Sequence, residues 1–224
     1  LNYFCEPSVR IEPFMDTPFI DIHTHRNEMR PNVVAIRSIR LGKECIPTSG
    51  EPFSAGIHPW DCETVGSEWL DSLETLPVAA VGEIGLDLCK PIDRTLQLQR
   101  LTEQAALAEK RRLPIVLHCV KAYDKLLSLM DRYTVPILFH GFTGSPQLAC
   151  QLIRKGYFLS FGTTLFRSPR TQEALRTTPY EHLFLETDEA DTTIEEIYRQ
   201  AAALRNTPIE TLKQSIYTNY KTLF

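Results

Sequence analysis

The sequence predicts a single (β/α)8 barrel of the TIM type, in which eight parallel strands alternate with helices. Three observations lead to this fold. Short apolar segments recur along the chain, and most are separated by stretches with helical spacing. Histidines and carboxylates follow several of these segments, where such barrels carry their functional groups. No repeat, low-complexity tract or linker divides the 224 residues. We therefore place one domain at residues 17–224 and leave residues 1–16 as an unassigned N-terminal extension.

The eight predicted strands are rich in Val, Ile, Leu and Phe, which favour extended structure. They cover residues 19–22, 33–39, 53–57, 78–84, 114–117, 135–139, 157–161 and 182–187. Most of the intervening stretches place apolar residues at helical spacing. The predicted helices cover residues 69–76, 93–112, 123–133, 146–155, 169–176, 193–205 and 209–217.

The connections after the first two strands contain no predicted helix. Residues 26–32 are too few for a helical crossover, and residues 41–52 hold two glycines and two prolines that indicate turns. We therefore expect shortened connections after strands 1 and 2. The outer layer is then thin on this side, or a second chain covers it, which makes a homo-oligomer one expectation.

The composition is that of an ordinary globular protein, with 43% hydrophobic and 23% charged residues. A formal net charge of −4 provides no general attraction to nucleic acid, so any attraction must be local or come from bound metal ions. The six cysteines include no C-x-x-C pair, which argues against a zinc ribbon or a disulfide scaffold. With no apolar stretch of about 20 residues and no recognisable signal peptide, we expect a cytoplasmic protein without a membrane partner.

The first strand runs directly into His23 and His25. Because alternate residues of an extended chain point to the same side, both imidazoles can aim at one point, and Asp21 is expected on the same face. Alone, this H-x-H pair describes two ordinary histidines equally well. The rest of the chain favours a metal site, since further ligand-type residues end the other predicted strands. These are His58, Glu83, His118, His140 and Asp188.

The chemistry of these residues indicates which ions they could hold. Imidazoles and carboxylates together suit zinc, manganese, iron or similar divalent ions, and a carboxylate can bridge two of them. Two ions a few ångströms apart can clamp a phosphoryl group and activate a water molecule. Asp188 is the natural group to hold that water and take its proton. The sixth histidine, His182, opens a predicted strand, so we interpret it as structural or surface-exposed.

At this point the residues resemble a known family, the TatD-type metal-dependent hydrolases, which are amidohydrolase-like barrels associated with deoxyribonuclease activity. The resemblance runs from about Phe19 to the end of the chain. Its motifs are Asp21-x-His23-x-His25, Gly56-Ile57-His58-Pro59, Gly82-Glu83-Ile84-Gly85-Leu86-Asp87, His118, His140-Gly141-Phe142-Thr143-Gly144-Ser145 and Glu186-Thr187-Asp188. The six-residue stretch that begins at Gly82 is the most specific of them.

The resemblance implies a metal-dependent deoxyribonuclease with two divalent ions, Zn, Mg or Mn. One ion would bind His23, His25, Glu83 and Asp188. The second would bind Glu83, His118 and His140, with Glu83 bridging. Asp188 and Glu83 would be catalytic. His58 would face the substrate or support a ligand, and Asp87 would orient a ligand or cap its loop.

Several positions depart from the family pattern. Val120 stands where relatives carry an arginine, with Lys121 beside it, and Leu88 replaces an aromatic residue. The usual proline after Asp188 is missing, and the following segment is short. The metal ligands are therefore complete, whereas the substrate loops differ. We count His58, Trp60 and Lys121 as candidate substrate contacts, although Trp60 could equally line a pocket wall and Lys121 could be an ordinary surface residue.

Two other functions stay open. A C–N or ester hydrolase acting on a small molecule would keep the metal site, and the acidic balance and altered loops motivate it; Glu83 in place of a lysine argues mildly against it. A barrel that binds metal and a partner without catalysis is the other. Barrels of the polymerase-and-histidinol-phosphatase type also begin with H-x-H, but the Gly-Glu-Ile-Gly-Leu-Asp stretch disfavours them.

Overall fold

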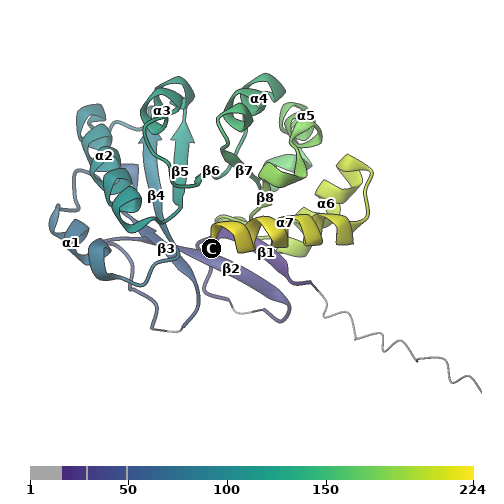
Figure 1. Cartoon of the computed structure of the whole chain (residues 1–224), viewed down its shortest axis with the longest axis horizontal. Coiled ribbons are helices and arrows are strands. Elements are labelled where there is room, and N and C mark those ends of the chain that lie inside the picture. Colours follow the sequence, from purple (N-terminus) through teal and green to yellow (C-terminus); the bar gives the residue numbers. More distant parts are fainter. Residues whose placement is uncertain (1–16, 29, 49) are drawn as a thin grey trace, which may run out of the picture.

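The computed structural model describes residues 17–28, 30–48 and 50–224, and within them it confirms the predicted barrel (Figure 1). Eight strands pair in parallel in the order of the sequence. They are β1 Phe19–Thr24, β2 Val33–Arg40, β3 Phe53–Gly56, β4 Ala80–Asp87, β5 Ile115–Val120, β6 Ile137–Phe139, β7 Phe158–Phe161 and β8 Leu183–Leu185. The predicted extension, residues 1–16, lies outside the described residues.

Helices follow the later strands and form the outer layer. They are α1 Glu68–Thr75, α2 Arg94–Arg111, α3 Tyr123–Met130, α4 Pro146–Arg154, α5 Pro169–Thr177, α6 Ile194–Arg205 and α7 Ile209–Leu223. Local capping explains where several of them begin. The Asp93 carboxylate accepts the Leu96 N–H at the start of α2, and Thr193 forms a reciprocal capping box with Glu196 at the start of α6.

The short connections were predicted correctly. The described residues between β1 and β2, and between β2 and β3, contain no helix, so this side of the sheet lacks the cover that α2 to α5 give to the later strands (Figure 1). Whether a second chain covers it stays a prediction. No helix in the described part of the chain is long and apolar enough to cross a membrane.

The barrel closes between its first and last strands at one point. Thr24 and Asp188 form an isolated parallel bridge, in which the Asp188 N–H donates to the His23 carbonyl and the His25 N–H donates to the Asp188 carbonyl. Elsewhere along this seam, side chains take the place of strand pairing. The Tyr198 hydroxyl of α6 hydrogen-bonds both the N–H and the carbonyl of Ile20, each at 3.2 Å.

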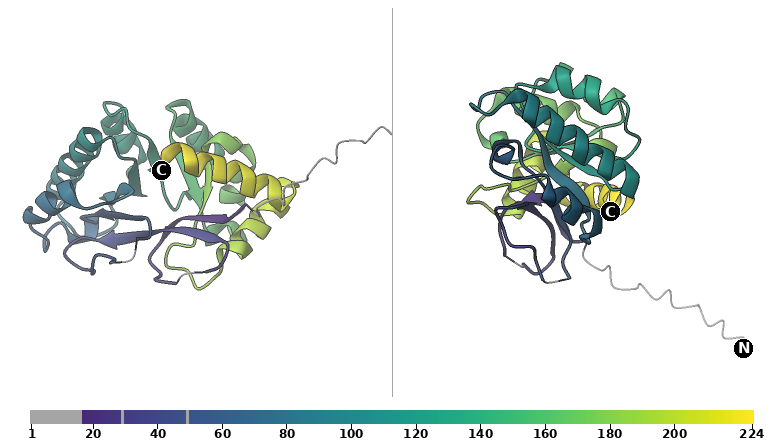
Figure 2. Two further views of the ribbon diagram at one scale, coloured as in Figure 1. Left: turned by 60° about the horizontal axis from the view of Figure 1, so that its bottom comes forward. Right: turned by 90° about the vertical axis from the view of Figure 1, so that its left-hand side faces the viewer.

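The C-terminal helix completes the seam from the other side. The Asn219 amide of α7 donates to the carbonyl of Leu183 at 3.0 Å, and α7 packs against both β1 and β8 (Figures 1 and 2). A buried backbone polar group without a partner costs free energy, so these side chains stabilise strand edges that would otherwise be unpaired. The last two helices therefore close the barrel as well as cover it.

Replacing Tyr198 with Phe tests this role, because the ring still packs against Phe19 while the hydroxyl is lost. We expect the free energy of unfolding to fall by about 1–3 kcal/mol, since Ile20 keeps two buried polar groups without a partner. Urea denaturation measures the change. Tyr217→Phe in α7 is the matched control and should stay within about 0.5 kcal/mol. Equal stability of the two variants would show that the hydroxyl does not support the seam.

Candidate metal centre

The buried carboxylate of Glu83 lies at the centre of a cluster of imidazoles. Its Oε1 atom is 2.5 Å from Nδ1 of His118 and 2.7 Å from Nε2 of His140. Its Oε2 atom is 3.4 Å from Nε2 of both His23 and His25. Each carboxylate oxygen therefore faces its own set of histidines, as a carboxylate that bridges two ions would.

Two further carboxylates lie beside this cluster. Asp188 Oδ1 is 3.7 Å from Nε2 of both His23 and His25. Glu186 Oε1 is 3.6 Å from Nδ1 of His140. The sequence interpretation gave Glu186 no role of its own. The signal was present in its spacing from Asp188, because alternate residues of an extended segment share a face.

The six predicted ligands thus come together from five strands. Together with His58 and Glu186 they form overlapping groups of three, in each of which the ligand atoms lie within 4.8 Å of one another. The groups are His23 with His25 and Asp188, His23 with Glu83 and His140, His58 with Glu83 and His118, and His140 with Glu186 and Asp188. His23 Nε2 and Glu186 Oε2 are buried and have no hydrogen-bond partner in the described chain. Buried polar atoms normally have a partner, and imidazole and carboxylate groups bind divalent ions, so bound ions fit this set of residues.

The carboxylates of the cluster differ in how readily they bind a proton. Burial by itself would raise the pKa of Glu83, but the neighbouring imidazoles of His140, His118 and His23 hold it well below its usual value. Burial and the neighbouring carboxylate of Glu186 raise the pKa of Asp188. Glu83 is therefore held as an anion, while Asp188 is the more readily protonated carboxylate of the site.

A shift in strand register brings His23 into the barrel. Asp21 of β1 pairs with Ala35 of β2, and Thr24 pairs with Arg37. β1 thus advances by three residues where β2 advances by two, so β1 contains a bulge between Asp21 and Thr24. The bulge reverses the alternation of side chains. The prediction that Asp21 shares the face of His23 is therefore wrong.

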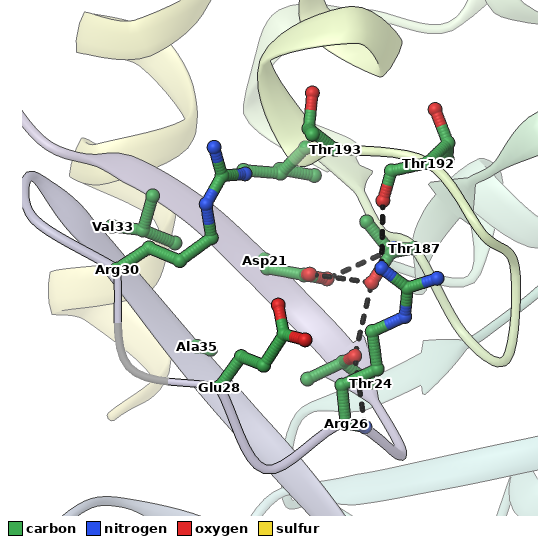
Figure 3. A pocket seen from close by; sticks show the side chains of 11 residues that line it. Asp21, Thr24, Arg26, Glu28, Arg30, Val33, Ala35, Thr187, Thr192 and Thr193 are labelled. Carbon is green, nitrogen blue, oxygen red and sulfur yellow. Dashed lines mark hydrogen bonds between the residues drawn. The ribbon is translucent and has the colours of Figure 1, made fainter.

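Asp21 instead points away from the histidines. Its carboxylate accepts the N–H of Thr187 at 3.0 Å and the hydroxyl of Thr187 at 2.6 Å, and it lines a cavity of about 280 Å³ beside the start of α6 (Figure 3). Burial raises its pKa to about 7. This contact ties β1 to the residue that precedes Asp188.

A second bulge lies in β4, between Val81 and Ile84, and it contains Glu83. The sequence placed Glu83 and His118 at the ends of their strands, and the structure corrects this. β4 continues to Asp87 and β5 to Val120, so both side chains project from within paired strands. Gly85, at which the predicted strand stopped, permits a close approach between β4 and β5, because a Cβ atom there would lie 2.0 Å from the carbonyl oxygen of His118.

His58 supports Glu83 from the end of β3. Its Nδ1 atom accepts the N–H of Trp60 at 3.1 Å, so a neutral ring carries its proton on Nε2, which lies 3.1 Å from Glu83 Oε1. Burial lowers the pKa of His58 and thereby favours this neutral form. The ring is 3% exposed. Its predicted contact with substrate stays a prediction.

The remaining predicted contacts lie at the rim. Trp60 is 36% exposed, and its Nε1 donates to Asp87 Oδ2 at 2.7 Å. The Lys90 ammonium lies 4.3 Å from the centre of the Trp60 ring. Asp87 also caps its own loop through the Cys89 N–H and lies 3.7 Å from His118 Nε2. Lys121 is exposed just after β5.

Comparison with known proteins identifies the family. The family model described as TatD related DNase matches residues 42–224. This chain belongs to the TatD-related DNase family. The predicted resemblance to TatD-type hydrolases is therefore confirmed, although the matched range begins after His23 and His25.

Individual relatives agree with this family. The chain is 33% identical over 194 residues to the uncharacterized metal-dependent hydrolase YjjV of Escherichia coli, covering 75% of this chain and 74% of that protein. It is 31% identical over 166 residues to the 3'-5' ssDNA/RNA exonuclease TatD of Cronobacter turicensis, covering 69% of this chain but only 63% of that relative. The crystal structure of YjjV superposes with a TM-score of 0.77 at 27% identity, over 94% of this chain and 99% of that chain.

Replacing Gly85 with Ala tests the tight contact between β4 and β5. The added methyl group meets the His118 backbone, and the residue has a φ of +154°. We expect the free energy of unfolding to fall by roughly 3 kcal/mol from overpacking and backbone strain. Chemical denaturation measures it, with Gly50→Ala as control, because a Cβ atom there meets nothing within 4 Å. A stable Gly85→Ala protein would contradict the close approach.

Proposed function

We propose that this chain is a divalent-metal-dependent hydrolase that cleaves phosphodiester bonds, with DNA as the expected substrate. The observation that carries the proposal is the position of Glu83, whose two oxygens face separate sets of histidines. Such an arrangement suits a pair of ions that clamps a phosphoryl group. The nuclease names of the family and of the Cronobacter relative support the choice of substrate.

The residues divide naturally between two ions. His23, His25 and Asp188 would hold one, His118 and His140 the other, and Glu83 would bridge them. The imidazole donors suit zinc, whereas magnesium and manganese prefer the oxygen ligands that Glu83 and Asp188 supply. Bound divalent ions supply Lewis acidity toward a phosphate oxygen and lower the pKa of a water molecule.

Two residues of the chain have distinct tasks in this scheme. The Asp188 side chain is 43% exposed and faces a cavity, so it can reach both the metal-binding cluster and an entering substrate. A carboxylate in this position could accept a proton from the attacking water and pass it on. His58 donates to Glu83 and holds the bridging carboxylate in place.

Metal removal and ligand substitution test the proposal together. Chelator-treated protein should lose turnover of oligodeoxynucleotides and regain it with Zn²⁺, Mn²⁺ or Mg²⁺. Asp188→Asn should lower kcat about a thousandfold, the range for losing a positioned general base. His140→Ala should lower the metal content per chain, as measured by mass spectrometry, because it removes an imidazole from the cluster. His182→Ala is the matched control, since His182 contacts the Tyr157 carbonyl at the opposite end of the barrel.

Chelator-insensitive cleavage, or equal metal content in the two histidine variants, would contradict the metal centre. A panel of small amides and carboxylic esters separates the second candidate function. Turnover of these compounds with none of any oligonucleotide would favour a C–N or ester hydrolase. Metal binding without turnover of any compound would favour a non-catalytic barrel.

A further inference from the structure

Two large apolar side chains are exposed in the described part of the chain, and both lie at the same end of the barrel. Trp60, 36% exposed, lies in the turn after β3, and Phe166, 47% exposed, ends the turn after β7. β3 and β7 are four strands apart in the barrel, so they lie on opposite sides of it. The Trp60 ring lies 5.9 Å from the ring of His118, centroid to centroid, whereas Phe166 lines a cavity of its own with Glu196, Arg199 and Gln200.

Each ring has an exposed cation close by. Lys90 lies over Trp60, and Arg167 follows Phe166 directly in the sequence. Exposed aromatic rings beside cations are the elements with which proteins bind single-stranded nucleic acid, through base stacking and phosphate contacts. Trp60 was expected from the sequence, whereas the turn after β7 was not.

A cavity of about 400 Å³ connects this turn to the metal centre. Its lining includes the carboxylates of Glu186, Asp188 and Glu189 together with Arg167. Two glycines and four threonines are also part of the lining, among them Thr143, Thr163 and Thr164. Hydroxyl groups and an arginine suit a phosphate and a sugar, and Arg167 forms no ion pair with the rest of the described chain.

We propose that residues 162–167 form a substrate subsite, in which Arg167 binds the phosphate next to the scissile phosphodiester and Phe166 stacks on a neighbouring base. The strand then crosses the mouth of the barrel from the Trp60 side to the Phe166 side. This inference rests on the proposed phosphodiesterase function. In this subsite the protein binds a phosphate of the nucleic-acid backbone and the face of one base. It makes no contact that distinguishes one base from another.

Substrates with and without a flanking phosphate test the subsite. Bis(p-nitrophenyl) phosphate carries one phosphodiester only, whereas a single-stranded pentadeoxynucleotide carries flanking phosphates. Arg167→Ala should lower kcat/KM for the pentanucleotide about tenfold, mainly through KM, and leave the small diester unchanged. Arg132→Ala is the matched control. Arg132 is an exposed arginine that follows α3 at the opposite face of the barrel, and its substitution removes the same charge. Equal effects of Arg167→Ala on both substrates, or none on either, would overturn the inference.

The position of the contact can be found by neutralising single phosphates. The flanking phosphates are replaced one at a time with uncharged methylphosphonates. At one position the replacement should weaken binding to wild-type protein, and at that position it should not change binding to Arg167→Ala. Fluorescence anisotropy in chelator measures this binding without turnover, so it tests the subsite even if no diester is cleaved. Failure of wild-type protein to cleave any diester would instead contradict the proposed function.

The aromatic ring has its own test. Phe166→Ala should weaken binding of the pentanucleotide about tenfold, the effect of losing one stacked base, and Phe166→Trp should restore it. An abasic site at the stacked position should remove the difference between wild-type protein and Phe166→Ala. If Phe166→Ala changes the oligomeric state in sedimentation and leaves oligonucleotide binding unchanged, the ring is a contact between chains and its assignment as a stacking group is wrong.

Discussion

The rest of the structure depends on the buried negative charge of Glu83. A carboxylate that is 3% exposed is stable as an anion only where hydrogen bonds and positive charge surround it. Here five imidazoles converge on its two oxygens, and His58 also fixes its orientation. The geometry that satisfies this charge in the protein is also the geometry that would hold two cations.

This arrangement requires irregular strands. Regular alternation would not turn His23 inward or place Glu83 where it lies, and each residue falls within a register shift of its strand. The single bridge between Thr24 and Asp188 then joins the first and last strands beside the cluster. The contact that closes the barrel therefore also positions Asp188 beside the histidines. The side chains of Tyr198 and Asn219 support the same seam from the outside.

Much of this could be predicted from the sequence, because periodicity and turn residues are local signals. The strand order, the short early connections and the convergence of histidines followed from them. The errors have a common cause, since they depend on neighbouring strands. The bulge that turns Asp21 outward is set by pairing with β2, and the extension of β4 through Gly85 to Asp87 is set by pairing with β5. Glu186 had a local signal in its spacing from Asp188, but its contact with His140 of another strand could not be predicted from the sequence.

The central claim is that Glu83 bridges two ions, and anomalous diffraction from crystals soaked in Mn²⁺ or Zn²⁺ tests it most directly. The account predicts two anomalous peaks, one beside each oxygen of Glu83. The first would lie among His23, His25 and Asp188, and the second between His118 and His140. A single peak, or two peaks with Glu83 turned away and Glu186 in its place, would contradict it.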